Sequence, residues 1–408
     1  MLGTWVPNDN NSFRVTDMAV YKDKLYLGHV NCKVDVWDVN SLTQVTSLET
    51  TRASDPSLAP AMEDNMLRSC GMALHNRTLA VNNATRTKVR LYNCDTDDLV
   101  GEIETRAGPI YNIAMNDRLL VCLSGWSLLS WRIDSARPDT VRGRFQGVCP
   151  DFEPSEDYEN WLEAHMSVIN DKYLVTKATR TLVNAAAVQQ VRKRIFLHVR
   201  RVGPDGYIGP VLRPESAALD TNIVELNCMQ LSENNMLATM VMMRNESSEF
   251  VTGNGHGVYY LRYVINIIDI TSGALVASMP TQSILSSVQI PICWKDDTLY
   301  VKIVPKPAGG FVSEDDEDLY EVSMAKWNIT TNKLTIIPSV KVSSSSDFMS
   351  LEAARLVVIS TKFSHRPFSF SVDGDDEAMH ESDVNNPEHG PRFTVKAATY
   401  DFWNLVET

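Results

Sequence analysis

The sequence predicts an all-β protein in which seven small sheets follow one another around a ring. Three observations support this prediction. A pattern of four short strands recurs along nearly the whole 408-residue chain, the third strand of each copy ends in a related motif, and the two chain ends complement each other as strands of one sheet. A four-stranded sheet cannot cover both of its faces alone, so we expect each sheet to stack on like neighbours. This arrangement is a β-propeller.

The first copy, which begins at Val15, shows the repeat most clearly. It divides into the apolar or alternating stretches VTDMAV, KLYLGHV, KVDVWDV and QVTSLE, separated by turn residues such as Lys22-Asp23 and Asn40-Ser41. The later copies keep this order. We therefore expect one domain over residues 1–408, with blades at about 15–50, 67–105, 108–146, 160–213, 224–280, 288–339 and 347–408, the last completed by 3–6.

The seventh copy ends after its third strand, which leaves its sheet one strand short. Residues 3–6, GTWV, precede the first complete copy and are expected to supply the missing outer strand. Placing both chain ends in one blade closes the ring and removes the exposed edges that make open sheets prone to aggregate. Rings of six or eight blades remain alternatives.

The motif at the end of the third strand carries a family resemblance. It reads VWDV, LYNC, SWRI, LHVR, IIDI, KWNI and FWNL at residues 36–39, 91–94, 130–133, 197–200, 267–270, 326–329 and 402–405. The series resembles the WD-repeat family, whose blades end in a Trp-Asp-like pair followed by a turn. Only Trp37-Asp38 is a literal pair, and Gly28-His29 stands in the second strand rather than before the third.

This resemblance implies a scaffold that holds other proteins. WD-repeat proteins of the F-box type recognise substrates for ubiquitin ligases, and a loose similarity to their propeller portion extends the expectation to such a complex. Those proteins carry a helical adaptor-binding module before the propeller, whereas strands are expected here from about residue 15. The chain is then a propeller portion, or a partner supplies that module.

Charge and cysteine content exclude several classes of partner and site. The net charge of −13 disfavours nucleic acid, because an acidic surface repels phosphate backbones. The seven cysteines are odd in number and include no C-x-x-C, which argues against a disulfide framework and a zinc site. The sequence shows no signal-peptide pattern and no apolar run of about 20 residues. We expect an intracellular protein, cytoplasmic or nuclear, without a membrane partner.

Sequence motifs do not indicate catalysis. The eight histidines form neither H-x-H nor H-E-x-x-H, and the chain has no G-x-S-x-G and no P-loop. We expect no catalytic residue, metal or cofactor. The alternative is a propeller enzyme of the hydrolase or quinoprotein type, with polar residues gathered in the central channel. A structural subunit of a large assembly, with an extensive apolar patch, is a third class.

The candidate binding residues lie in the blades with long connections between second and third strands, where propellers expose binding loops. Blade four inserts about residues 178–191 and then carries the basic stretch VRKRIFLHVRR. In a strand, Arg192 and Arg194 share one side and Lys193 points to the other, while Arg180 and Arg192 flank the loop. Arginine forks bind phosphate or carboxylate, which predicts an acidic or phosphorylated partner segment. The alternative is an edge strand that its charges protect from aggregation.

Tryptophans form the remaining candidates. Trp126, in the turn LSGWSL of blade three, is predicted either as an interface anchor or as packing over the blade. Trp37, Trp131 and Trp327 recur at equivalent strand positions, and we expect them in the core between blades.

Overall fold

The computed structural model describes most of the repeat and leaves out parts of its connections. The described residues are 2–5, 15–29, 33–41, 43–48, 71–83, 87–105, 110–124, 127–133, 144–148, 166–182, 192–212, 223–244, 261–281, 292–295, 297–303, 322–342, 346–352, 355–364 and 392–401. All the regular elements within these residues are β-strands.

Antiparallel pairing groups the strands into seven four-stranded sheets. In chain order these are β2 (Val15–Tyr21), β3 (Lys24–His29), β4 (Val34–Asp38) and β5 (Thr43–Leu48); β6 (Met72–His75), β7 (Thr78–Asn82), β8 (Lys88–Asn93) and β9 (Asp98–Glu104); β10 (Ile110–Met115), β11 (Leu119–Ser124), β12 (Ser127–Arg132) and β13 (Arg144–Val148); β14 (Ser167–Ile169), β15 (Tyr173–Leu182), β16 (Arg192–Val202) and β17 (Ile208–Leu212); β18 (Ile223–Leu231), β19 (Met236–Arg244), β20 (Leu261–Asp269) and β21 (Ala274–Thr281); β22 (Ile292–Lys295), β23 (Thr298–Ile303), β24 (Val322–Asn328) and β25 (Lys333–Val342); and β26 (Ser346–Glu352), β27 (Arg355–Ser364), β28 (Arg392–Asp401) and β1 (Leu2–Trp5).

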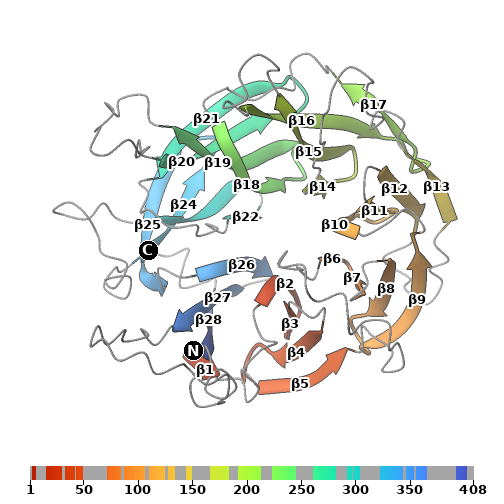
Figure 1. Ribbon diagram of the computed structural model, residues 1–408. Helices are drawn as coiled ribbons and strands as arrows, with labels where there is room; N and C mark the ends of the chain where they lie inside the picture. Colours follow the sequence, from red (N-terminus) through yellow and green to blue (C-terminus); the bar gives the residue numbers. More distant parts are fainter. Residues whose placement is uncertain are drawn as a thin grey trace, which may run out of the picture.

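The sheets are arranged as the blades of a propeller. The first strand of each sheet contacts the first strands of the two neighbouring sheets, and β26 contacts β2, so the series closes on itself (Figure 1). Strand β1 completes the last sheet by pairing with β28, from Leu2 opposite Ala398 to Trp5 opposite Val395. The expected closure by the two chain ends is therefore present, one residue earlier than the predicted 3–6.

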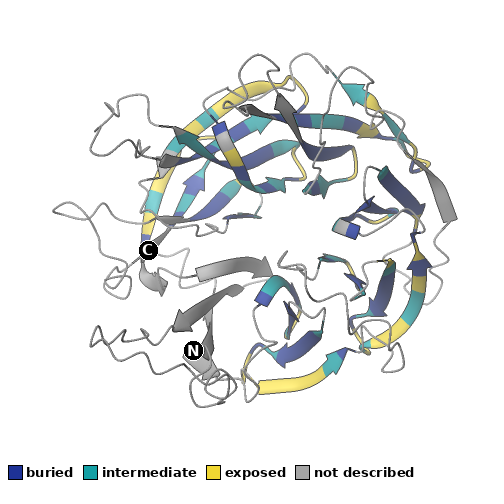
Figure 2. Ribbon diagram, viewed as in Figure 1, coloured by how far each residue is buried: buried dark blue, intermediate teal, exposed yellow. Residues whose placement is uncertain are grey.

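The expectation of a seven-bladed propeller needs a correction. Side-chain packing is described for six blades, not seven (Figure 2). For the sheet β1-β28-β27-β26, the structure describes the backbone pairing alone. Statements about side chains below therefore concern the six blades from β2–β5 to β22–β25, which we number one to six in chain order.

A repeated backbone bond shows where the Trp-Asp-like pair lies in each of these blades. The amide of the residue after the pair donates to a carbonyl in the turn between the first and second strands. These bonds are Val39 to Asp23 (2.8 Å), Cys94 to Arg77 (2.8 Å), Ile133 to Arg118 (2.7 Å), Val202 to Lys172 (2.8 Å), Ile270 to Asn235 (3.2 Å) and Ile329 to Asp297 (3.2 Å). In each of these six blades the bond joins the end of the third strand to the same turn.

Two of the predicted motif positions were wrong. In blade four the pair is Arg200-Arg201, not His198-Val199, because Leu174 faces Arg200 as Leu25 faces Trp37 in blade one. In the last sheet Leu356 faces Tyr400, so Tyr400-Asp401 hold the position. The FWNL stretch at 402–405 lies outside the described residues. In blade four the slip is two residues, and because side chains alternate with a period of two, it preserves the apolar pattern of the strand.

The core lies between the blades, and the recurring tryptophans belong to it. Trp37, Trp131 and Trp327 are 7%, 4% and 3% exposed. Trp131 packs in one cluster with Leu91 of the preceding blade, and Trp327 packs in one cluster with Ile265 of the preceding blade. For these two residues the prediction of a core between blades is confirmed; the described neighbours of Trp37 all belong to its own blade.

Candidate functional site

Blade four contains a hairpin that extends beyond its sheet. Strands β15 and β16 pair from Tyr173↔Arg201 to Leu182↔Arg192. Strand β14 pairs only with residues 174–176, and β17 pairs only with residues between 199 and 202. Within the described residues, the pairs from Lys177↔Leu197 outward thus form a two-stranded extension, here called the blade-four ribbon. The expected insertion at 178–191 is shorter than predicted, because residues 178–182 continue the strand.

The register places the three predicted arginines on one face of this ribbon. Arg180 stands opposite Arg194, and Leu182 stands opposite Arg192. Directly opposed residues of an antiparallel pair lie on the same face, and so do alternate residues along a strand. Lys193, opposite Thr181, lies on the other face. The expected separation of Lys193 from Arg192 and Arg194 therefore agrees with the backbone.

The base of the ribbon is anchored in the propeller core. On the Lys193 face, Ile195 and Leu197 pack in one cluster with Leu226 of blade five. Lys177, 7% exposed, donates from Nζ to the carbonyl of Leu226 at 3.0 Å. These contacts direct that face toward blade five.

The arginine face is the side of the sheet that packs on blade three. At its base, Leu174 and Val202 join a cluster with Leu119 and Val121 of blade three. Arg200 lies on the same face, fully buried, and donates from Nη1 to Thr176 Oγ1 at 3.3 Å. Its position in the strand is equivalent to that of the tryptophan in blades one, three and six. The buried Arg200 is thus on the same face of β16 as Arg192 and Arg194.

The two strands of the ribbon are strongly basic in an acidic protein. Residues 177–182 contain two lysines or arginines and residues 192–197 contain three, and neither segment contains an aspartate or glutamate. The chain as a whole has a net charge of −13. Such a local reversal of sign attracts anionic ligands and orients their approach.

Trp126, the other predicted binding residue, lies outside the described residues. Its neighbours Ser124 and Ser127 pair with each other at the ends of β11 and β12. Its role as an anchor or as packing stays a prediction.

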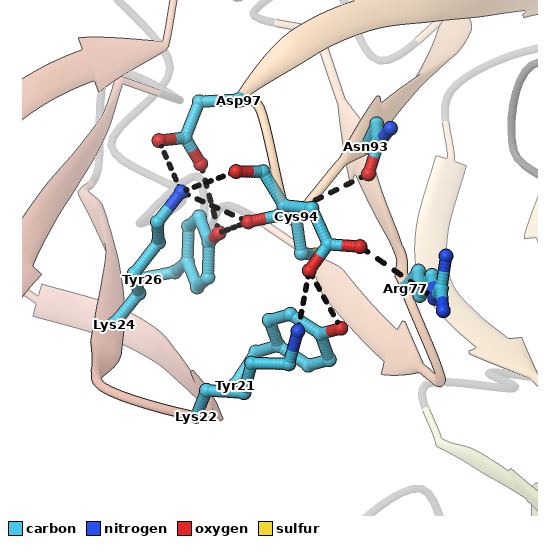
Figure 3. Close-up of polar contacts among 9 residues, drawn as sticks. Tyr21, Lys22, Lys24, Tyr26, Arg77, Asn93, Cys94 and Asp97 are labelled. Carbon is cyan, nitrogen blue, oxygen red and sulfur yellow. Dashed lines mark hydrogen bonds and ion pairs between the residues drawn. The ribbon is translucent and has the colours of Figure 1, made fainter.

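A polar cluster that the sequence did not reveal joins blades one and two (Figure 3). Lys24 Nζ lies 2.7 Å from Asp97 Oδ2, and the Tyr26 hydroxyl donates to Asp97 Oδ1 at 2.9 Å. Lys22 pairs with Asp95 at 2.6 Å, and this contact raises the pKa of Lys22 and lowers that of Asp95. Lys22 and the start of β3 thus meet the turn at 94–97, about 70 residues later in sequence. All of these groups satisfy one another across the blade boundary, so the cluster serves assembly of the ring.

A buried acid–base group in blade one has the wrong order for nucleophilic catalysis. Asp35 is central: His29 Nε2 lies 3.1 Å from its Oδ2, and the Ser47 hydroxyl donates to its Oδ1 at 2.5 Å. Burial opposes ionisation, but contacts with His29, Ser47 and Lys33 outweigh it and lower the pKa of Asp35 to about 2. An activated serine needs the base beside its hydroxyl, whereas Ser47 donates to the acid.

The described cysteines are free thiols, of which Cys94, Cys122 and Cys293 are buried and Cys228 is partly buried. Burial raises the pKa of Cys94 and of Cys228 to about 12 and raises those of Cys122 and Cys293 further. Within the described part of the chain, no group of three or more histidine, cysteine, aspartate or glutamate residues could hold a metal ion. The same residues contain no helix that is long and apolar enough to cross a membrane.

Comparisons with known proteins return distant propellers. No protein-family model and no curated protein sequence matches the chain. Similar solved structures include the β-propeller domain of Cps50 (Swd1) from Myceliophteria thermophila, with 10% identity over 94% of this chain and 98% of that one and a TM-score of 0.45. Hsv2 from Kluyveromyces lactis has 12% identity, covers 95% and 99% of the two chains and has a TM-score of 0.40.

A third similar structure is the computationally designed protein Ika8, with 12% identity over 85% of this chain and 81% of that one and a TM-score of 0.45. Because these identities and scores are low, the propeller assignment rests on the strand pairing of the chain itself.

Proposed function

We propose that this chain is a non-enzymatic interaction propeller that holds an acidic or phosphorylated segment of a partner protein on the blade-four ribbon. The observation that carries the proposal is the register of the ribbon, which sets Arg180 opposite Arg194 and puts Arg192 on the same face. Guanidinium groups bind phosphate and carboxylate through two parallel hydrogen bonds, which gives both affinity and orientation.

The setting of the ribbon supports this role. Its base is packed against blade five through Ile195 and Leu197, so the three arginines belong to strands with a packed base rather than to a loop. Its charge is opposite to that of the whole chain, which favours an anionic ligand on this blade. The finer role, substrate recognition in a ubiquitin ligase, and an intracellular location are part of the proposal and rest on the family resemblance and the sequence alone.

The test is affinity purification from native lysate, followed by mass spectrometry. It compares the wild-type chain with Arg180→Glu/Arg192→Glu/Arg194→Glu and with a control of equal charge change. The control, Arg77→Glu/Arg132→Glu/Lys333→Glu, alters exposed cations of blades two, three and six. We expect a set of partners that binds wild type and control and is lost from the ribbon variant.

Two treatments of the lysate identify the anion. Partners that are released by phosphatase carry the phosphate form of the ligand, and partners that resist it carry carboxylates. Partners that depend on nucleic acid disappear with nuclease, and that outcome would overturn the proposal, as would an unchanged partner set in the ribbon variant. Co-purified ligase subunits would identify the complex as a ubiquitin ligase; their absence removes only that finer role.

A further inference from the structure

We propose that the ribbon selects anions on alternate residues of an extended partner segment, so that its ligand has the pattern acid-x-acid or phosphoresidue-x-phosphoresidue. The opposed residues Arg180 and Arg194 form the position for one anion, and Arg192, two residues along β16 on the same face, forms the position for the next. This inference rests on the proposed function and names the spacing that the site recognises.

The first observation is an opposed pair of like charges. Arg180 and Arg194 are direct partners, and Cβ atoms in such pairs are about 4.5–5.5 Å apart. Like charges at this separation destabilise a hairpin, and the ribbon segments 177–182 and 192–197 contain no aspartate or glutamate. Local conflicts of this kind are expected where a sequence serves binding rather than folding. An anion bound at this opposed pair offsets the repulsion between the two positive charges.

The second observation is the distance to the next arginine. Arg192 and Arg194 are two residues apart on β16, which corresponds to about 6.6 Å along a strand. An extended ligand advances by the same rise per residue, so its alternate side chains match this separation and point in one direction. Anions on adjacent residues point to opposite sides, and anions three residues apart are about 10 Å apart and also on opposite sides.

The ribbon also provides an internal control. Lys193 lies between the two arginines in sequence but on the other face, opposite Thr181. If binding depends on net charge alone, substitution of Lys193 weakens it as much as substitution of Arg194. If the ligand binds on the face that carries the arginines, substitution of Lys193 has the smaller effect.

The experiment is fluorescence anisotropy with the purified full chain and labelled peptides of equal length and charge. The peptides carry two phosphoserines that are adjacent, separated by one residue, or separated by two, and a parallel set carries glutamates. We expect the peptide with one intervening residue to bind about ten- to a hundredfold more tightly than the others, which is the range for one charge-assisted hydrogen-bonded contact. Comparison of the two sets shows whether phosphate or carboxylate is preferred.

Variants separate recognition from folding. Arg194→Glu is expected to lose the spacing preference and to unfold at a higher temperature, because it replaces a repulsive pair by an attractive one. Lys193→Glu is expected to keep the preference. Equal binding of all spacings, with binding still lost in Arg194→Glu, overturns the spacing rule and leaves the proposed function standing. Failure of every peptide to bind counts against both, and equal losses in the Lys193 and Arg194 variants overturn the assignment of faces.

Discussion

Asp17 offers the sharpest test of how the blades are joined. It lies on β2, the innermost strand of blade one, and is partly buried. Its Oδ1 accepts the amide of Met18 and its Oδ2 accepts the amide of Met72, both at 2.8 Å. Met72 belongs to β6 of the next blade, so this carboxylate links two innermost strands. Loss of water around the group outweighs these two hydrogen bonds and raises its pKa to about 7.

Because the pKa of Asp17 is raised in the folded protein, this group makes the protein less stable as the pH rises. In the unfolded chain the carboxyl group titrates near 3.8, so between pH 4 and pH 7 the folded protein holds a proton that the unfolded chain has released. The stabilisation is complete below about pH 4, decreases as the pH rises and is absent above about pH 7. Applied to pH 5 and pH 8, the two pKa values give up to about 2.5 kcal/mol of lost stability.

Asp17→Asn removes this titration while keeping one acceptor oxygen. Asn112 holds the equivalent place in β10 and accepts the amide of Ser167 from the next blade at 2.9 Å, so an amide can make the link. Urea unfolding of wild type and variant at pH 5 and pH 8 measures the effect. The free energy of unfolding of wild type, minus that of Asp17→Asn, is expected to fall by up to about 2.5 kcal/mol between the two pH values. Because all other titrating groups are present in both proteins, their contributions cancel when the two free energies of unfolding are subtracted at each pH.

A second variant serves as the control for this measurement. Asp98→Asn changes an exposed aspartate on β9. It is expected to leave the pH dependence as in wild type. A difference between wild type and Asp17→Asn that stays constant from pH 5 to pH 8 would show that the Asp17 carboxyl group is ionised throughout, and would refute the argument from burial.

Three further predictions concern packing. Trp327→Ala, which empties a buried site between blades five and six, is expected to cost about 3–5 kcal/mol in urea unfolding, and a cost below 1 kcal/mol would contradict the packing. Asp97 has a φ of 61° and bonds Lys24 and Tyr26; Asp97→Ala is expected to cost about 1–3 kcal/mol, and Asp97→Asn less, because asparagine tolerates this backbone conformation. Alkylation of Cys122 and Cys293 is expected only at the rate of unfolding, as burial raises the pKa of both thiols; modification of the native protein at the rate of an exposed thiol would contradict it.

The repeat could be predicted from the sequence because each blade encodes its own strands and turns. The order of four strands, the tryptophans Trp131 and Trp327 between blades, and the joining of the two chain ends all follow from local pattern and from the need to cover sheet faces. The basic stretch at Arg192 and Arg194 was also visible, as was the assignment of Lys193 to the other face. These features depend on alternation within one strand or on composition, which a single sequence contains.

What only the tertiary structure decided is register and the contacts between blades. Alternation cannot distinguish His198 from Arg200 at the Trp-Asp position, since both lie on one face and only pairing with Leu174 tells them apart. Nothing near Arg180 in sequence indicates that Arg194 stands opposite it, and nothing near Asp17 indicates that Met72 supplies its partner. A strand repeats every two residues, so its sequence determines which face a side chain takes, whereas the residue that it meets is set by a strand elsewhere in the chain.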